Sequence, residues 1–167
     1  PELPEVETIV RGLQKQLVGK KIIDVKALLP KIIRGDAKDF IAKVSGTAIR
    51  KVWRRGKMIV IDLASGKHIL IHLKLSGQLV FNLPNAPIAK HTHLIFELSD
   101  DKQLRYLDVR QFGHLCLVDA SMLQPLTPSG ADPLEISLNK FKRLVQSRKA
   151  RIKSLLLNQT FLAGIGN

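Results

Sequence analysis

Residues 57–73 have the sequence KMIVIDLASGKHILIHL, in which two short segments rich in Ile, Val and Leu flank a turn at Gly66. Short apolar segments bounded by turn residues are typical of β-strands. The pattern recurs from residue 20 to residue 119 and predicts about eight strands. These cover residues 22–29, 47–53, 57–63, 68–73, 78–83, 93–98, 103–109 and 114–118. Strands at this spacing indicate an antiparallel two-sheet β-sandwich or a flattened barrel.

The stretch before the strands has a helical period. Apolar side chains recur at Val6, Ile9, Val10, Leu13 and Leu17. Pro4 is tolerated in a first helical turn, and Gly19 is placed to end the helix. We therefore expect a helix over residues 4–17 that packs on the sandwich.

The chain changes character again after the strands. Four turn-forming residues fall within a short stretch and indicate a linker: Pro125, Pro128, Gly130 and Pro133. Beyond it, Ser137 can cap a helix that extends to residue 148, and a second helix is expected over residues 150–158. The pattern predicts an α+β protein with three parts: a sandwich domain over residues 1–123, a linker over 124–136 and the first helices of an incomplete helical domain over 137–167.

The balance of charge points to a polyanionic partner. The chain has 27 Lys and Arg against 14 Asp and Glu, a formal net charge of +13. An excess of this size favours nucleic acid, through long-range attraction and the release of condensed counterions. An acidic membrane surface is the alternative, but no segment has the pattern of a basic amphipathic helix.

Membrane-spanning and metal-binding classes are not favoured. No apolar run reaches the roughly 18 to 20 residues that cross a bilayer, and no signal-peptide pattern opens the chain. Cys116, the single cysteine, cannot form an internal disulfide or a zinc site by itself. We therefore expect a cytoplasmic protein with no metal bound by these residues.

The first residue offers a nucleophile. With Pro1 at the terminus, its nitrogen is a secondary amine beside Glu2 and Glu5. Free α-amines titrate near about 8, so a usable fraction is neutral at physiological pH. Attack on a sugar C1′ would yield an iminium, an electron sink that acidifies the C2′ hydrogens for elimination of the phosphates, while a neighbouring carboxylate passes protons. The ordinary alternative is a terminal proline without function.

Six motifs along the chain resemble those of formamidopyrimidine-DNA glycosylases. The first is PELPEVET at residues 1–8. The others follow in order: RRGK at 54–57, HLKLSG at 72–77, KHTH at 90–93, DVRQFG at 108–113 and GIGN at 164–167. Each later motif is weak by itself, but six in sequence are specific. The chain therefore resembles the amino-terminal portion of a bacterial enzyme of this family.

The resemblance implies catalytic roles for four residues. Pro1 would be the nucleophile that forms a Schiff base, and Glu2 would be the acid and base that assists ring opening and elimination. Glu5 would help to organise the pocket, with an ordinary first-turn acid as the alternative. Lys57 would reach the phosphates around the lesion, with a solvated turn lysine as the alternative.

The resemblance also implies residues that enter the DNA. Removal of a base from a duplex requires the nucleotide to leave the stack, and side chains must then fill the space. Arg110 would face the estranged cytosine and Phe112 would wedge between bases. Leu75 stands where the family has methionine, a departure that should preserve filling with an altered fit. Core packing is the alternative for Phe112 and Leu75.

Further basic and polar residues match backbone contacts of the family. His91 would contact the DNA backbone, Lys153 a phosphate and the oxidised purine, and Asn167 a phosphate at a glycine turn. His93 is expected instead to support its strand. Arg54 and Arg55 are expected to be solvated charges that add backbone attraction.

These roles imply a base-excision-repair glycosylase that removes oxidised purines, formamidopyrimidines and 8-oxoguanine, and then cleaves the strand by β- and δ-elimination. Its partner would be damaged double-stranded DNA. It would act as a monomer in the bacterial cytoplasm, associated with the nucleoid. The alternatives are an endonuclease VIII-like glycosylase for oxidised pyrimidines, a DNA-binding protein without catalysis and, more distantly, a basic barrel that binds RNA.

The family has further parts that these residues do not include. The resemblance implies a completed helix–two-turn–helix motif after Asn167, and a four-cysteine finger that holds one zinc ion. Without them, we expect weak or no excision of bases from duplex DNA. Cleavage at preformed abasic sites should be retained more readily, because no base has to be recognised.

Overall fold

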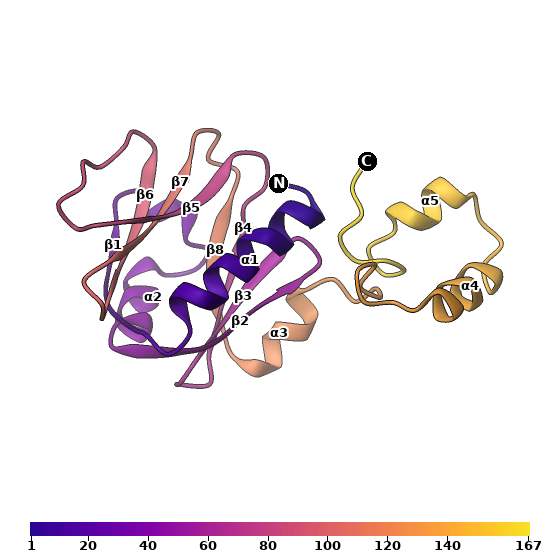
Figure 1. Cartoon of the computed structure of the whole chain (residues 1–167), viewed down its shortest axis with the longest axis horizontal. Helices are drawn as coiled ribbons and strands as arrows, with labels where there is room; N and C mark the ends of the chain where they lie inside the picture. The colour runs from indigo at the N-terminus through magenta and orange to yellow at the C-terminus, as the bar shows by residue number, and fades with distance from the viewer.

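The computed structural model describes all of residues 1–167 and shows two lobes of unequal size (Figure 1). The sandwich lobe (residues 1–127) holds eight strands and four helical segments: α1 (Leu3–Leu17), the 3₁₀ turn η1 (Pro30–Ile32), α2 (Ala37–Val44) and α3 (Ala120–Leu126). The helical lobe (residues 128–167) holds α4 (Leu138–Gln146) and α5 (Ile152–Leu157). None of the helices has the length and apolar character needed to cross a bilayer.

The strands form one antiparallel array in the order β5-β7-β6-β1-β2-β3-β4-β8. Their bounds are β1 (Lys21–Ala27), β2 (Thr47–Arg55), β3 (Met58–Leu63), β4 (His68–His72), β5 (Gly77–Asn82), β6 (Thr92–Leu98), β7 (Gln103–Asp108) and β8 (His114–Val118). β1 and β2 pair only at Lys21↔Ala48 and Ile22↔Thr47. The array therefore turns at this short pairing into two layers, which confirms the predicted sandwich.

The hairpin of β3 and β4 explains how the layers pack. Successive side chains of a strand point to opposite faces, and here both faces are apolar. Ile59 and Ile71 face the main core, which they share with Phe96 of the other layer. Val60 and Leu70 face outward into a smaller cluster, together with Leu123 of α3. The outer face of this layer is thus buried because α3 covers it.

Helix α1 begins at Leu3, one residue before the predicted start, and ends at Leu17 as predicted. Its buried side chains are Leu3, Val6, Val10, Leu13 and Leu17. This apolar stripe packs the helix mainly against β2. The amino-terminal residues of the chain are thereby held at one end of the sandwich.

Two helices of the sandwich lobe were not expected. Helix α2 has only eight residues, and although Phe40, Ile41 and Val44 have helical spacing, the pattern lasts for just two turns. Its signal was the cap at Asp36, whose side chain accepts hydrogen bonds from the backbone of Lys38 and Asp39. Helix α3 contains Pro125, a residue that was predicted to lie in a linker. It crosses the domain boundary expected at residue 123, and that boundary stays a prediction.

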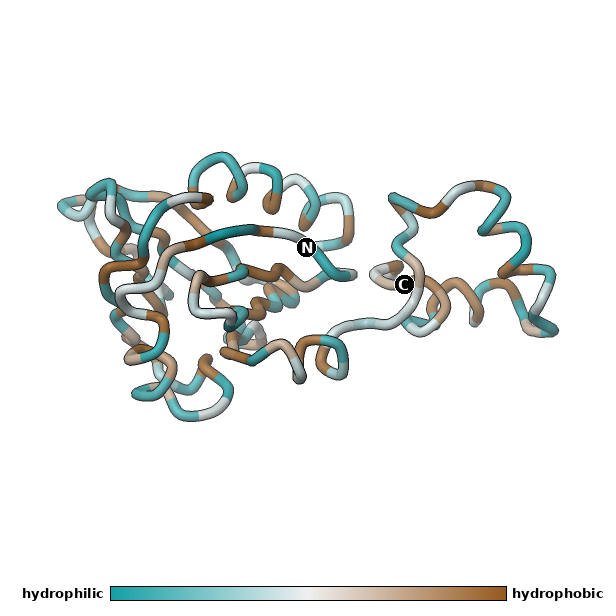
Figure 2. The backbone as a smooth tube through the Cα atoms, turned by 90° about the horizontal axis from the view of Figure 1, so that it is seen from below, coloured by the Kyte–Doolittle hydropathy of each residue, from teal (hydrophilic) through white to brown (hydrophobic).

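The helical lobe has a small core of its own. Helix α4 starts directly after Ser137, whose hydroxyl accepts from the backbone nitrogen of Lys140 as predicted, and it ends at Gln146 rather than residue 148. The buried cluster consists of Leu155, Phe161 and Leu162. Figure 2 shows hydrophobic stretches along the tube of both lobes.

Candidate active site

The start of α1 holds the first two residues in place. Glu2 is the N-cap residue of this helix. Its backbone nitrogen donates a 2.6 Å hydrogen bond to Oε2 of Glu5. A carboxylate in the first turn satisfies a backbone donor that has no partner in the helix. Glu5 therefore fixes the backbone beside Pro1, and its role in organising a catalytic pocket stays a prediction.

Lys57 meets Glu2 at this end of the sandwich. It lies in the tight turn between β2 and β3, where Gly56 adopts a φ of +58°. Its Nζ lies 2.6 Å from Oε2 of Glu2. The lysine side chain is only 22% exposed, whereas that of Glu2 is 62% exposed. The ion pair thus places a carboxylate and an ammonium group next to the Pro1 amine.

The carboxyl-terminal glycine turn lies against this ion pair. A Cβ at Gly166 would overlap Oε2 of Glu2 and approach Nζ of Lys57 to 2.5 Å. Gly164, with a φ of +104°, leaves equally little room beside Leu3. Both chain ends accordingly meet at the junction of the lobes (Figure 1). A Cβ at Gly166 would therefore displace the ends of the Glu2 and Lys57 side chains, and the positive φ of Gly164 favours glycine at that position.

The amide of Gln159 holds the turn in place. Its Oε1 accepts a 2.7 Å hydrogen bond from the backbone nitrogen of Gly164, and its Nε2 donates to the carbonyl of Ile165 at 2.9 Å. Residue 131 of the linker forms a parallel bridge with Leu162. Hydrogen bonds therefore hold residues 164–165, which lead to the site, against the rest of the helical lobe.

Two clefts meet at Pro1, and both are lined by Pro1, Glu2, Lys74 and Leu75. One continues along the start of β5, and the other passes Lys57 and His72 towards the helical lobe. Burial, and then the positive charges of Lys74, His114, Lys57 and the terminal amine, lower the pKa of His72 to about 4. The imidazole is accordingly neutral at pH 7.

This arrangement can carry out amine chemistry. A neutral secondary amine is a nucleophile for an electrophilic carbon, and an adjacent carboxylate can accept and return protons. The ammonium of Lys57 adds positive charge that would attract a phosphate. The four residues predicted as catalytic are thus brought together, through Glu2 at the centre.

The residues predicted to enter DNA lie on two neighbouring loops, between β4 and β5 and between β7 and β8. Leu75 is 65% exposed and Phe112 is 56% exposed. The guanidinium carbon of Arg110 lies 5.1 Å from the centre of the Phe112 ring. Core packing, the alternative considered for Leu75 and Phe112, is excluded by this exposure.

The two histidines of the KHTH motif have different surroundings. His93 is 6% exposed, and its Nε2 forms a 2.7 Å hydrogen bond with the backbone carbonyl of Asp108. His91 is half-buried, and its backbone has a φ of +66°. Its carbonyl accepts from the backbone nitrogen of Asp108 at 3.0 Å. His93 therefore supports the sheet as expected, while His91 keeps part of its side chain available for DNA.

No hydrogen bond or ion pair joins Lys153 or Asn167 to the Glu2–Lys57 pair. Both are exposed. Lys153 stands on α5 and makes no ion pair within the chain. Asn167 follows Gly166 directly, so it is the nearer of the two to the site. Neither side chain makes a hydrogen bond or an ion pair within the chain, and the contacts of both residues with DNA stay predictions.

Arg54 corrects the expectation of a solvated charge. Its side chain is 4% exposed and lies between two carboxylates, 2.5 Å from Oε2 of Glu7 and 2.8 Å from Oδ2 of Asp132. The hydrogen bond from Arg54 holds the pKa of Glu7 below its usual range. Arg55 donates to the carbonyl of Pro128 at 2.7 Å. The two arginines thus fasten α1 and the linker to β2, which the RRGK motif alone did not suggest.

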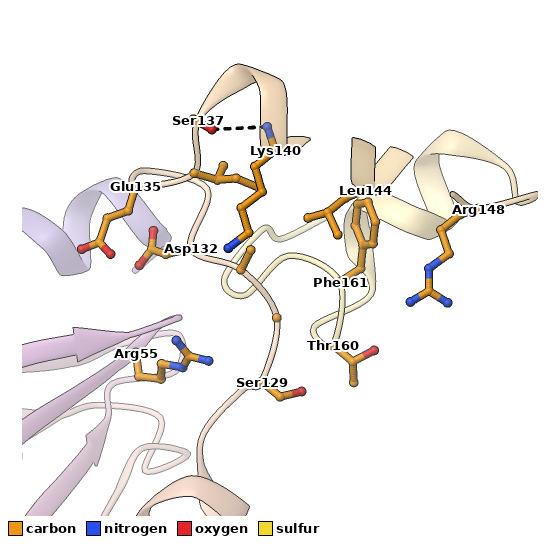
Figure 3. A pocket seen from close by; sticks show the side chains of 13 residues that line it. Arg55, Ser129, Asp132, Glu135, Ser137, Lys140, Leu144, Arg148, Thr160 and Phe161 are labelled. Carbon is orange, nitrogen blue, oxygen red and sulfur yellow. Dashed lines mark hydrogen bonds between the residues drawn. The ribbon is translucent and has the colours of Figure 1, made fainter. Parts of the chain in front are cut away.

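A second cavity, of about 640 Å³, lies at the joint of the lobes (Figure 3). Arg55 lines one side of it, and residues 129–132 and 135–137, α4, Arg148 and residues 160–161 line the rest. Figure 3 shows acidic and basic side chains around it, among them Asp132, Glu135 and Lys140. Arg55 apart, none of the residues predicted to act in catalysis or to contact DNA belongs to this lining, and neither Pro1 nor Glu2 lines it.

The zinc ion that the resemblance implies for the family does not fit the residues present. The chain holds one cysteine, Cys116, which is half-buried on β8. No group of three or more His, Cys, Asp or Glu side chains is arranged to hold a metal ion. A four-cysteine site therefore has no ligand set among residues 1–167.

Known proteins share the sequence pattern of this chain. The family model of the formamidopyrimidine-DNA glycosylase N-terminal domain matches residues 1–115. A formamidopyrimidine-DNA glycosylase of Pelotomaculum thermopropionicum is 45% identical over the whole chain, and one of Desulforamulus reducens is 41% identical. The chain spans 63% of the length of each of these relatives.

Solved structures share the fold over the whole chain. A structure of MutM in complex with carbocyclic 8-oxo-G containing DNA has a TM-score of 0.88 at 34% identity, with 64% of that chain covered. A complex between the Lactococcus lactis Fpg and an abasic site containing DNA has a TM-score of 0.88 at 32% identity, with 63% of that chain covered.

Proposed function

This chain belongs to the formamidopyrimidine-DNA glycosylase family, and from that premise we propose that it is a DNA glycosylase and abasic-site lyase whose nucleophile is the Pro1 amine. The observation that carries the proposal is the 2.6 Å ion pair between Glu2 and Lys57 beside Pro1, covered by the turn at Gly166. This arrangement offers an amine, a carboxylate and a cation to one nucleotide.

In the proposed reaction, the Pro1 nitrogen attacks C1′ of the damaged nucleotide, and the bond from C1′ to the base breaks. The sugar ring opens as O4′ takes up a proton, and an iminium links Pro1 to C1′. Loss of a C2′ hydrogen expels the 3′ phosphate, and a second elimination expels the 5′ phosphate. Glu2 passes the protons, and water finally releases the amine.

The exposed loops support access to a nucleotide within a duplex. An extruded nucleotide leaves an unstacked gap, which is costly unless side chains fill it. Leu75 and Phe112 offer exposed apolar groups, and Arg110 adds a cation with donors for the base left behind. We assign the filling of the gap to these three residues.

The remaining contacts of the proposed complex are to the DNA backbone. Lys57 would hold the phosphates beside the lesion, and His91 a phosphate farther along. Lys153 and Asn167 would bring the helical lobe onto the same strand. Phosphate contacts of this kind position the protein without reading sequence.

The substrates that this proposal includes are formamidopyrimidines and 8-oxoguanine opposite cytosine, in damaged double-stranded DNA. The protein would act as a monomer on the chromosome, in the cytoplasm of a bacterium. The amine and carboxylate chemistry is carried by this chain's own residues. Zinc would belong to a carboxyl-terminal finger such as the family resemblance implies, outside residues 1–167.

Borohydride trapping on a duplex with one abasic site tests the proposal. Reduction of the iminium should leave a covalent adduct, and mass spectrometry of its tryptic peptides should locate the DNA on Pro1. A chain acetylated at its amino terminus and the variant Pro1→Gly are the controls, and the acetylated chain should form no adduct. An adduct on a lysine, or binding without any adduct, would leave a DNA-binding protein and refute the proposed chemistry.

Release of 8-oxoguanine from a duplex under single-turnover conditions tests the substrate. The base should be released opposite cytosine faster than opposite adenine, because Arg110 is assigned to the estranged cytosine. Preferential release of an oxidised pyrimidine would favour the endonuclease VIII-like alternative instead.

A further inference from the structure

The two loops that carry Leu75 and Phe112 are joined beneath the surface by one buried carboxylate. Asp108 ends β7 and is 1% exposed. Its Oδ1 accepts a hydrogen bond from the hydroxyl of Ser76, in the loop between β4 and β5. Its Oδ2 accepts from the backbone nitrogen of Gly113 at 2.8 Å, in the loop between β7 and β8, and from the hydroxyl of Tyr106 at 3.0 Å.

Ser76 also contacts the second loop directly. Its hydroxyl oxygen accepts a 3.0 Å hydrogen bond from the backbone nitrogen of Arg110, while it donates to Asp108. Leu75 precedes this serine in the chain, and Phe112 lies two residues after Arg110. The hydroxyl group of Ser76, which follows Leu75, therefore binds the backbone of Arg110, and the guanidinium of Arg110 lies over the ring of Phe112.

The backbone of both loops is held in uncommon conformations. Lys74 and Gln111 have φ values of 52° and 56°, in the left-handed region that non-glycine residues rarely adopt. Gly113 has no room for a Cβ, which would overlap the hydroxyl of Tyr106 and lie 2.9 Å from Oδ2 of Asp108. Such conformations persist only where the surroundings hold them.

Hydrogen bonds, including one from the backbone of Gln111, compensate the charge of Asp108. Burial by itself would raise the pKa of Asp108, but the hydrogen bonds from Ser76, Gly113 and Tyr106 hold it below its usual range. No ion pair reaches this carboxylate. An ionised buried carboxylate accepts hydrogen bonds from neutral donors more strongly than a neutral acceptor would. These hydrogen bonds therefore stabilise the observed conformation of both loops.

We infer that Ser76 and Asp108 are positioning residues that hold Leu75 at a fixed place relative to Arg110 and Phe112, so that the three side chains enter the DNA gap as one rigid unit. The inference rests on the proposed function and specifies how its DNA-entering residues are organised. Loops ordered in advance lose less conformational entropy when they bind. The network therefore favours insertion without contacting the DNA.

Trypsin digestion of the free protein tests the rigidity of the loops without any DNA. Ser76→Ala removes both hydrogen bonds, and Ser65→Ala, in the exposed turn between β3 and β4, is the matched control. Cleavage after Arg110 should be at least about fivefold faster in Ser76→Ala, because local opening of the loop precedes cleavage. Equal cleavage in the two variants, at equal thermal stability, would overturn the inference.

Fluorescence of 2-aminopurine beside an abasic site tests the organisation on DNA. At saturating protein, Ser76→Ala should reach at most about half of the plateau of the unmodified protein, because insertion is incomplete. Ser65→Ala should reach the plateau of the unmodified protein, because Ser65 lies in the turn between β3 and β4 and in neither of the two loops. A wild-type plateau for Ser76→Ala would overturn the inference, whereas a lack of trapping by the unmodified protein would refute the proposed function and leave the digestion result standing.

Discussion

The ammonium group of Lys57 lies 2.6 Å from the carboxylate of Glu2, and both groups press against the backbone of Gly166. The turn between β2 and β3, the start of α1 and the end of the chain thus converge on the Pro1 amine. Because Glu2 is largely exposed, this ion pair contributes little to stability. Its removal should therefore affect the reaction much more than the fold.

Replacement of Lys57 by methionine tests whether the ion pair affects the reaction more than the stability of the fold. Lys57→Met keeps the length of the side chain and removes its charge. Borohydride trapping on abasic DNA should slow by about tenfold or more, because a phosphate contact near the reacting sugar is lost. The free energy of unfolding should change by less than about 1 kcal/mol. Lys38→Met, at an exposed site on α2, controls for the loss of one charge, and an equal slowing in that variant would contradict the assigned role.

Replacement of Arg54 by leucine should destabilise the protein. The change leaves Glu7 and the poorly exposed Asp132 without their partner, and removal of one member of a buried ion pair costs about 3 kcal/mol. Urea unfolding should measure the loss. Arg50→Leu, at an exposed position of the same strand, should change the free energy of unfolding by no more than about 0.5 kcal/mol. Equal effects in the two variants would show that the Arg54 ion pairs contribute nothing.

His72 should make the stability depend on pH in the acid range. Its pKa is lowered from 6.5 to about 4 in the folded state, so the unfolded chain binds more protons between these values. Its contribution is therefore complete above pH 6.5 and is lost as the pH falls through about 4. The contribution of His72 to the free energy of unfolding is at most about 3 kcal/mol, and it is smaller because solvent screens the half-buried ring. His72→Gln should flatten this part of the curve of unfolding free energy against pH, and an unchanged slope would contradict the assignment.

Replacement of Phe112 by alanine should spare the fold and impair insertion into DNA. Phe112 is 56% exposed, so the free energy of unfolding should change by less than about 0.5 kcal/mol. The plateau of 2-aminopurine fluorescence beside an abasic site should fall nearly to that of free DNA. Leu83→Ala, at an apolar position that is 59% exposed elsewhere on the lobe, should leave the plateau unchanged. A large loss of stability in Phe112→Ala would restore the core-packing interpretation.

The family and the eight strands were predicted correctly from the amino-acid sequence. The strands could be located because each is a short apolar segment between turn residues, a pattern that depends on neighbouring residues only. The family, recognised from six motifs, is confirmed by the match to residues 1–115. Helices α2 and α3 escaped prediction, since α2 buries just two core side chains and α3 contains Pro125.

The partners of the polar side chains could not be predicted in the same way. RRGK suggested basic residues in contact with DNA, yet Arg54 is enclosed by Glu7 of α1 and Asp132 of the linker. HLKLSG and DVRQFG pointed to Leu75 and Phe112, but not to the hydrogen bond between Ser76 and Asp108 that joins their loops across 32 positions.

The sequence by itself determined the order of the eight strands and of helices α1, α4 and α5, the family and the kinds of side chain available for the reaction, because periodicity and motif spacing are local properties. Only the tertiary structure decided which of those side chains meet. The packing of α1 against β2 brings Glu2 to Lys57 in the turn between β2 and β3, and the return of the chain places Gly166 against the pair. A hydrogen bond or ion pair depends on a separation of a few ångströms in space, and distance along the chain does not specify that separation.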